Sequence, residues 1–371
     1  MSALLLSASL IVRNEERFLE GCLRSLAGRA DEIVVVDTGS TDRSREIAAD
    51  LGARVIEHEW RDDFSAARNA AIDAARGAWI LYIDADERVV EFDRTAIHAQ
   101  LADARYACYR VLFRPVTGLT RYREYRLFRN HPAIRFRGVI HETLLPALHE
   151  LTARTGLQIG DSPLALDHLG YDGDQSHKHE RNLRLLRARL ERDPEHVYSL
   201  DHLATTLLGV GDSAGAEDAW RRAIDIVRAK GGRMASDSLP WAHLGEFLLN
   251  RKRDAAALLD EGCRLFPRDH SLTWLRARSL IEAGEHAAAM PLLDALTRID
   301  VDALADGSLA FDRGIFGVHS HAALGLCAFR LGRYTESAQH YGRAEALAPD
   351  SLEYRSKRML AEIRARSQAQ G

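Results

Sequence analysis

Cysteine is scarce in this sequence and never clustered. The four cysteines stand singly, without a C-x-x-C pair, at Cys22, Cys108, Cys263 and Cys327. This spacing excludes a disulfide framework and a thiolate metal site, because both need cysteines that are grouped. Scattered thiols are typical of a reducing compartment, and we therefore expect a cytoplasmic protein.

Long hydrophobic runs and blocks of like charge are also missing. The apolar opening at 4–12 is interrupted by Ser7 and Ser9, and it lacks the basic start and cleavage site of a signal peptide. No stretch approaches the ~20 apolar residues that cross a bilayer. Lys plus Arg number 50 against 54 Asp plus Glu, a net charge of -4, so the basic surface of a nucleic-acid binder is not expected. We expect no transmembrane segment and no nucleic-acid partner, while peripheral contact with a membrane stays open.

The first half of the chain has the pattern of an α/β domain. With 371 residues, the chain is too long for one compact core. Short apolar runs such as EIVVVDTG alternate with amphipathic stretches such as STDRSREIAADLG. This alternation predicts a mostly parallel sheet with crossover helices over 1–175, with ligands at the carboxyl ends of its strands.

The second half has a helical pattern from about residue 182 onward. Alanine, glycine and aromatic residues recur at intervals that resemble tetratricopeptide helix-turn-helix units, whose period is about 34 residues. The ranges 231–240 and 300–320 are interpreted as insertions. We expect an all-α repeat domain of three or four helical hairpins over 176–371, and its exposed face leaves a homo-oligomer open.

One polar string, IVVVDTGSTD, follows an apolar strand and ends at a predicted helix. A carboxylate at Asp37 can accept hydrogen bonds from a base or a ribose, and Gly39 lets the backbone turn. The alternative is that Asp37 is only a turn residue and Asp42 only a helix cap. Because G-x-G-x-x-G and P-loop strings are absent, neither a dinucleotide fold nor a P-loop is indicated.

The second polar string is WILYIDADE, in which a buried strand ends at paired carboxylates. In an extended chain, Asp84 and Asp86 project to the same side and could hold a divalent cation with a diphosphate. The alternative is a solvated acidic turn. Its place directly after a strand and downstream of IVVVDTGSTD favours the binding site.

Four strings in this order resemble the family 2 glycosyltransferases, in particular the bacterial branch with a C-terminal tetratricopeptide extension: LIVRNEERFLEGCLRSL, DEIVVVDTGSTD, WRDDFSAARNAAIDAARGAWILYIDADE and RGVIHE. The resemblance covers roughly 7–175. It implies a GT-A nucleotide-binding fold, a nucleotide-diphosphate sugar donor with UDP favoured, a divalent metal (Mn²⁺ or Mg²⁺), and inversion at the anomeric carbon. The Q-x-x-R-W string of processive synthases is absent, so we expect transfer of one sugar or a few to a protein, peptide, saccharide or lipid-linked acceptor.

The resemblance also implies roles for single residues. The nucleotide-sugar site would comprise Val12, Arg13, Asn14, Glu15, Asp37, Gly39, Arg68, Asp84 and Ala85. Asp86 would ligate the metal that holds the donor phosphates, and Asp84 would reach the ribose or the metal. His141 or His168 would be a further ligand, because imidazole suits Mn²⁺ better than Mg²⁺.

Glu142 would be the general base that removes the acceptor proton. If RGVIHE is a strand, His141 and Glu142 face opposite sides and only one points into the site. A rival interpretation is a tetratricopeptide scaffold with an inactive nucleotide domain, because repeat grooves commonly bind peptides. The intact carboxylates of the two polar strings argue for the enzyme.

Overall fold

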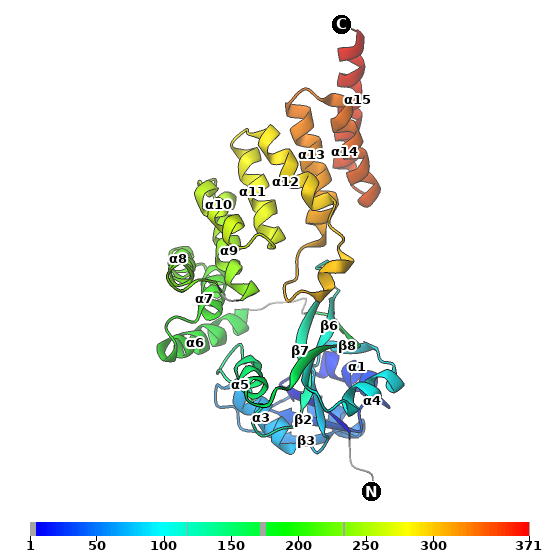
Figure 1. Ribbon diagram of the computed structural model, residues 1–371, viewed down its shortest axis with the longest axis vertical. Coiled ribbons are helices and arrows are strands. Elements are labelled where there is room, and N and C mark those ends of the chain that lie inside the picture. Colours follow the sequence, from blue (N-terminus) through cyan, green and yellow to red (C-terminus); the bar gives the residue numbers. More distant parts are fainter. Residues whose placement is uncertain (1–4, 117, 171–175, 233, 371) are drawn as a thin grey trace. The chain divides into compact units, whose positions relative to one another are not determined.

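The computed structural model describes residues 5–116, 118–170, 176–232 and 234–370 (Figure 1). The chain forms two compact units. The first contains the chain up to Pro194 apart from 118–120, together with Ala305–Ser308, and the second contains the rest. In the described ranges, no helix is long and apolar enough to cross a membrane.

The first unit is built on an eight-stranded sheet with the order β3-β2-β1-β4-β7-β6-β8-β5. Four strands, adjacent in that order, are parallel: β1 (Leu6–Val12), β2 (Glu32–Asp37), β3 (Arg54–Glu57) and β4 (Trp79–Tyr82). Three helices connect them: α1 (Glu16–Leu26), α2 (Ser44–Asp50) and α3 (Phe64–Ala74). The predicted α/β class and element order of this half are confirmed.

The other half of the sheet is mixed. Its elements are β5 (Glu87–Glu91), α4 (Arg94–Ala102), β6 (Tyr106–Pro115), β7 (Tyr122–Arg129), α5 (Leu145–Thr155) and β8 (Gln158–His168). Strand β7 pairs antiparallel with both β4 and β6, and β8 pairs parallel with β6 and antiparallel with β5. The sequence analysis identified no strands over 87–135, because the frequent arginines of strings such as YREYRLFR hide the strand alternation.

Helices cover both faces of the sheet. On one face, Leu19 and Leu23 of α1 pack in a cluster with Leu10. On the other, Ile72 of α3 and Leu148 of α5 pack with side chains of β2, β4 and β7. Burial of each such side chain contributes about 1.5–3 kcal/mol. This packing fixes the sheet edge at which β1, β2 and β4 end, and the loops that follow these strands carry the predicted site.

Within the described residues, the second unit contains four helical hairpins and a last helix. They are α7 (Val197–Gly209) with α8 (Ser213–Lys230), α9 (Leu239–Asn250) with α10 (Ala256–Leu265), α11 (His270–Glu282) with α12 (His286–Thr297), α13 (Val318–Arg330) with α14 (Tyr334–Leu347), and α15 (Leu352–Gln370). The ranges interpreted as insertions hold short 3-10 helices: η1 (Ala235–Ser238), η2 (Asp302–Asp306) and η3 (Arg313–Phe316). The predicted all-helical region is confirmed.

Close contact between paired helices explains two recurring glycines of the repeats. A Cβ atom on Gly325 would lie 3.0 Å from the Tyr341 ring, and one on Gly245 would lie 2.5 Å from Leu259. The Ser337 hydroxyl donates to the Gly325 carbonyl across the same hairpin, at 2.7 Å. Glycine at these positions lets each helix approach its partner, which is why it recurs in the repeat.

Helix α6 (Ser176–Arg192) belongs to the first unit. The first compact unit therefore continues past residue 175, where the sequence placed the domain boundary. The division into domains at residue 175 stays a prediction.

Candidate functional site

The loops after β1 and β2 are tied together by Asn14. Its backbone is left-handed, with φ +57°. The Asn14 side-chain oxygen accepts from the Thr41 N–H at 2.8 Å, and the Asn14 N–H donates to the Ser40 hydroxyl at 3.0 Å. Asn14 therefore holds in place the two loops at the carboxyl edge of the sheet.

Asp37 forms the turn after β2. Its carboxylate accepts from the N–H groups of Gly39 and Ser40 at 3.1 Å, and the residue is 2% exposed. Gly39 has φ +104°, which favours glycine. The turn interpretation accounts for these contacts, and a contact of Asp37 with a nucleoside stays a prediction.

A pocket of about 330 Å³ opens beside these loops. It is lined by Ile11, Val12, Arg13, Glu15, Thr38, Trp60, Phe64, Arg68, Asp84, Ala85, Asp86, His168 and Arg181. The structure thus brings most of the residues implied by the motifs to one cavity. Trp60, Phe64 and Arg181 were not anticipated by sequence reasoning.

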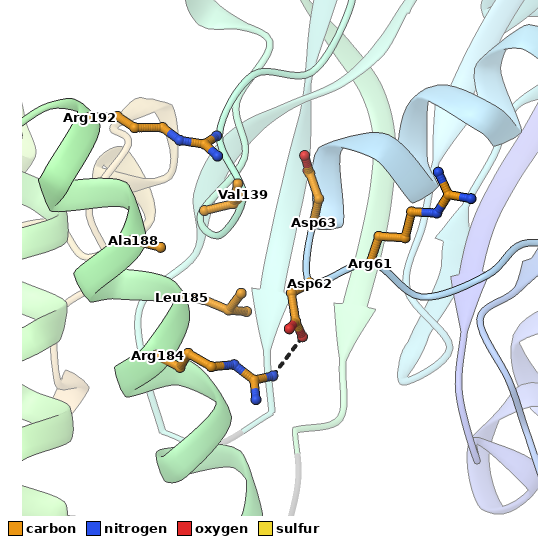
Figure 2. A pocket seen from close by; sticks show the side chains of 8 residues that line it. All are labelled: Arg61, Asp62, Asp63, Val139, Arg184, Leu185, Ala188 and Arg192. Atoms are coloured by element: carbon orange, nitrogen blue, oxygen red, sulfur yellow. Dashed lines mark hydrogen bonds and ion pairs between the residues drawn. The ribbon is translucent and has the colours of Figure 1, made fainter.

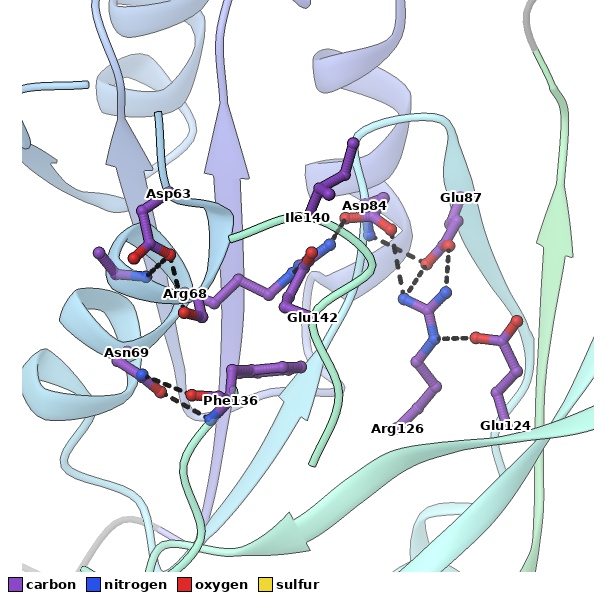
Figure 3. A network of polar contacts seen from close by, with 12 residues as sticks. Asp63, Arg68, Asn69, Asp84, Glu87, Glu124, Arg126, Phe136, Ile140 and Glu142 are labelled. Atoms are coloured by element: carbon purple, nitrogen blue, oxygen red, sulfur yellow. Dashed lines mark hydrogen bonds and ion pairs between the residues drawn. The ribbon is translucent and has the colours of Figure 1, made fainter. Parts of the chain in front are cut away.

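A chain of ion pairs connects the pocket residues Arg68 and Asp84 with neighbouring side chains (Figure 3). Arg68 donates through Nε to Glu142 at 2.5 Å and through Nη2 to Asp84 Oδ1 at 2.9 Å. Arg126 of β7 donates to the other Asp84 oxygen at 3.3 Å. Both oxygens of Asp84 are therefore engaged by guanidinium groups.

These contacts decide the charge of Asp84. Although burial opposes its ionisation, Arg68 and Arg126 hold the pKa of Asp84 well below its usual range. Each Asp84 oxygen keeps a further lone pair, but the two guanidinium cations beside it disfavour the approach of a metal cation. The geometry therefore favours Asp84 as a fixed hydrogen-bond acceptor and leaves Asp86 as the carboxylate of the D-x-D string that has no arginine partner among the described residues.

Arg126 is a site residue that the sequence did not reveal. Its side chain is only 7% exposed, lies over the Tyr82 ring at 4.2 Å, and pairs with Glu87 at 3.0 Å and Glu124 at 2.7 Å. An arginine in a strand with an irregular apolar period is usually expected on the surface. Only the antiparallel pairing of β7 with β4 places it under Asp84.

Asp86 and His168 meet at the mouth of the pocket. Asp86 Oδ2 and His168 Nε2 are 3.1 Å apart, and the register of β5 with β8 pairs Glu87 with His168. The hydrogen bond with Asp86 raises the pKa of His168, although burial opposes this. The strand pairing therefore selects His168 as the histidine beside the D-x-D string.

This pair has the geometry of two metal ligands. Two atoms that each lie about 2.1 Å from an octahedral ion, at right angles, are about 3.0 Å apart. Among the described residues, no three His, Cys, Asp or Glu side chains are grouped to hold a metal ion. Asp86 and His168 could hold a cation only after giving up the hydrogen bond between them, because a ring nitrogen that carries a proton cannot ligate a metal.

The RGVIHE segment is a loop and not a strand, so the alternation argument for His141 and Glu142 does not apply. His141 has φ +50°, in the left-handed region. The Asn69 side chain donates to the Phe136 carbonyl at 3.0 Å and accepts from the Phe136 N–H at 2.9 Å, which fixes this loop to α3. Within the described ranges, neither His141 nor Glu142 lines the 330 Å³ pocket, and their roles stay predictions.

Arginines of helix α6 contact the segment before α3 and the RGVIHE loop. Arg184 pairs with Asp62 at 2.7 Å, and Arg189 donates to the Ile140 carbonyl at 3.2 Å. A second pocket of about 230 Å³ lies between α6 and the segment before α3 (Figure 2). Its lining residues are Arg61, Asp62, Asp63, Val139, Arg184, Leu185, Ala188 and Arg192.

The chain is similar in sequence to glycosyltransferases and to a repeat protein. Residues 7–145 match the family model of Glycosyl transferase family 2. A TPR repeat-containing protein of Synechococcus elongatus is 37% identical over 219 residues, which cover 57% of this chain and 54% of that protein. The prophage-derived glycosyltransferase SunS of Bacillus subtilis is 28% identical over 200 residues, which cover 52% of this chain and 46% of SunS. The chain thus spans about half the length of these relatives.

Among solved structures, glucosyl-3-phosphoglycerate synthase from Mycobacterium tuberculosis, in complex with Mn²⁺, UDP and glucosyl-3-phosphoglycerate, is similar at a TM-score of 0.37. The sequence identity is 18%, and the match covers 51% of this chain and 80% of that protein.

Proposed function

We propose that this chain, which carries a family 2 glycosyltransferase domain at residues 7–145, transfers a sugar from a nucleotide-diphosphate donor to a protein, glycan or lipid-linked acceptor, with inversion at the anomeric carbon. The observation that carries the proposal is the 330 Å³ pocket, in which Asp84, Asp86 and His168 converge at the carboxyl edge of the sheet. UDP is the favoured nucleotide, by the resemblance of the motifs.

The donor would lie along the loops after β1, β2 and β4. Asp84, fixed by Arg68 and Arg126, is suited to accept a hydrogen bond from a ribose hydroxyl. Asp86 and His168 would hold Mn²⁺ or Mg²⁺, which offsets charge on the diphosphate when bound.

Glu142 is the proposed acceptor base. The acceptor oxygen would bond to the anomeric carbon as the bond to the diphosphate breaks with its electron pair on the leaving oxygen, and Glu142 would take the acceptor proton. Arg68 orients the Glu142 carboxylate through their ion pair. To receive a proton, Glu142 would have to loosen this contact, and an anionic donor offers Arg68 another partner.

The acceptor side is proposed to include the second pocket beside α6 (Figure 2). Val139 in its lining is close in sequence to Glu142, and Asp63 directly precedes Phe64 of the donor pocket. The helical repeats would bind the acceptor or a partner protein.

An inactive scaffold is the second candidate, because the Synechococcus relative is named for its repeats alone. The two are separated by incubating the full chain with UDP-sugars and Mn²⁺. Release of UDP, together with a Mn²⁺-dependent thermal shift with UDP, would support the enzyme. The absence of both UDP release and a thermal shift with any nucleotide would support the scaffold.

A further inference from the structure

Two arginines of the donor pocket are not ion-paired with any carboxylate in the described part of the chain. They are Arg13, in the loop after β1, and Arg181, on α6. Arg181 lies over the Phe64 ring at 5.2 Å, and it donates to the side-chain oxygen of Asn182 at 3.2 Å. The pocket's third arginine, Arg68, is by contrast neutralised by two carboxylates.

Both guanidinium groups line the same pocket, where their like charges act against one another. Burial lowers the pKa of Arg181, the charge of Arg13 lowers it further, and only Asp62 opposes them. Asp62 is itself ion-paired with Arg184. Arg181 is half-buried and Arg13 is exposed. A half-buried cation with a like charge beside it and no carboxylate partner is costly, and an anion bound between the two would reduce that cost.

We infer that Arg13 and Arg181 form a receptor for a phosphate-type anion and that the donor's diphosphate fills it. The inference rests on the proposed function. It assigns part of the donor site to α6, which lies outside the 7–145 region matched by the family.

The chemistry of transfer gives this pair a role. When the bond between the anomeric carbon and the diphosphate oxygen breaks, the electron pair stays on that oxygen and the diphosphate gains one negative charge. Planar guanidinium groups donate paired N–H bonds to phosphate oxygens. Contacts that strengthen as the charge develops lower the barrier rather than only tightening the ground state. Arg181 would thus contribute to both UDP affinity and turnover.

The test compares two charge-removing variants of the same helix. Arg181→Gln removes a pocket arginine, and Arg187→Gln removes an exposed one that does not line the pocket. Binding of UDP, uridine and inorganic pyrophosphate is measured by calorimetry on the full chain, with and without Mn²⁺. If a screen identifies another base, its diphosphate and nucleoside replace UDP and uridine.

We expect Arg181→Gln to weaken UDP and pyrophosphate binding roughly 10- to 100-fold, the range for a lost hydrogen bond to a charged group. Uridine affinity should stay unchanged, and the melting temperature should not fall, because the substitution removes one of two like charges that have no carboxylate partner among the described residues. Arg187→Gln should bind all three probes as the parent does, and Arg181→Lys should recover part of the loss.

Two results would overturn the inference. An equal loss of affinity for UDP and uridine would mean that Arg181 acts by supporting the Phe64 ring. Unchanged UDP and pyrophosphate binding in Arg181→Gln would place the diphosphate elsewhere, and a raised acceptor KM in that same variant would assign the pair to an anionic acceptor. Failure of the parent chain to bind any nucleotide would instead contradict the proposed function, independently of Arg181.

Discussion

Removal of the Arg126 guanidinium should destabilise the first unit far more than removal of a surface arginine. Arg126 pairs with Asp84, Glu87 and Glu124 while only 7% exposed, and the Glu87 side chain is 2% exposed. Arg126→Gln leaves the buried Glu87 and its neighbour Glu124 without this cation, while Asp84 keeps its ion pair with Arg68. Breaking a buried pair from one side typically costs about 3–5 kcal/mol, because the charge left behind is buried.

The matched control is Arg114→Gln on the neighbouring strand β6. Arg114 also pairs with two carboxylates, Glu91 at 2.5 Å and Asp167 at 2.9 Å, but its side chain is 33% exposed. Exposed pairs contribute about 0.2–1 kcal/mol, so the control should change stability little.

The assay is denaturant unfolding of the full chain, with hydrogen exchange of β4 and β7 to report on the first unit alone. We expect Arg126→Gln to lower the free energy of unfolding of this unit by about 3 kcal/mol or more, and to weaken nucleotide binding, since Asp84 loses its orientation. A loss below about 1 kcal/mol, equal to that of Arg114→Gln, would refute the view that Arg126 neutralises a buried acidic cluster.

Two further predictions concern the proposed base and the helical unit. Glu142→Gln keeps the shape of the side chain and removes its basicity, so transfer measured by product formation should fall about 10²- to 10⁴-fold while calorimetric UDP affinity is kept; transfer at the parental rate would place the base elsewhere. His243 contacts Asp201 at 2.8 Å, and although burial opposes protonation, this hydrogen bond raises the pKa of His243 above 6.5. Its contribution to stability should therefore be complete below pH 6.5 and lost as pH rises through the raised pKa. Thermal unfolding against pH should show this decline in the parent and not in His243→Gln, and equal slopes in both would contradict it.

The local pattern of the sequence predicted the donor edge of the sheet well. Apolar runs ending at polar strings gave β1, β2 and β4, and the motifs gave Asp84 and Asp86. These signals are local, since strand period and turn residues lie within a few positions of one another.

Contacts between distant segments could not be read in the same way. The sequence left His141 and His168 as alternatives, and only the register of β8 against β5 brings His168 to Asp86. In the sequence, Arg126 and Arg181 resemble surface arginines, because the period of a strand or helix does not show which charged side chains of other elements lie next to them. Whether RGVIHE forms a strand was left open by the sequence, and the left-handed backbone of His141 belongs to a loop.

Turnover of a UDP-sugar by the full chain, with and without Mn²⁺ and in the Asp86→Asn variant, tests the proposed glycosyl transfer most directly. We predict UDP release that depends on the divalent cation and falls at least ~100-fold in Asp86→Asn, the order seen when one electrostatic transition-state stabiliser is removed. The free energy of unfolding should change by less than about 1 kcal/mol, because within the described part of the chain the Asp86 carboxylate is ion-paired with one side chain, the partly exposed His168. Parental turnover by Asp86→Asn in the presence of EDTA would contradict the account.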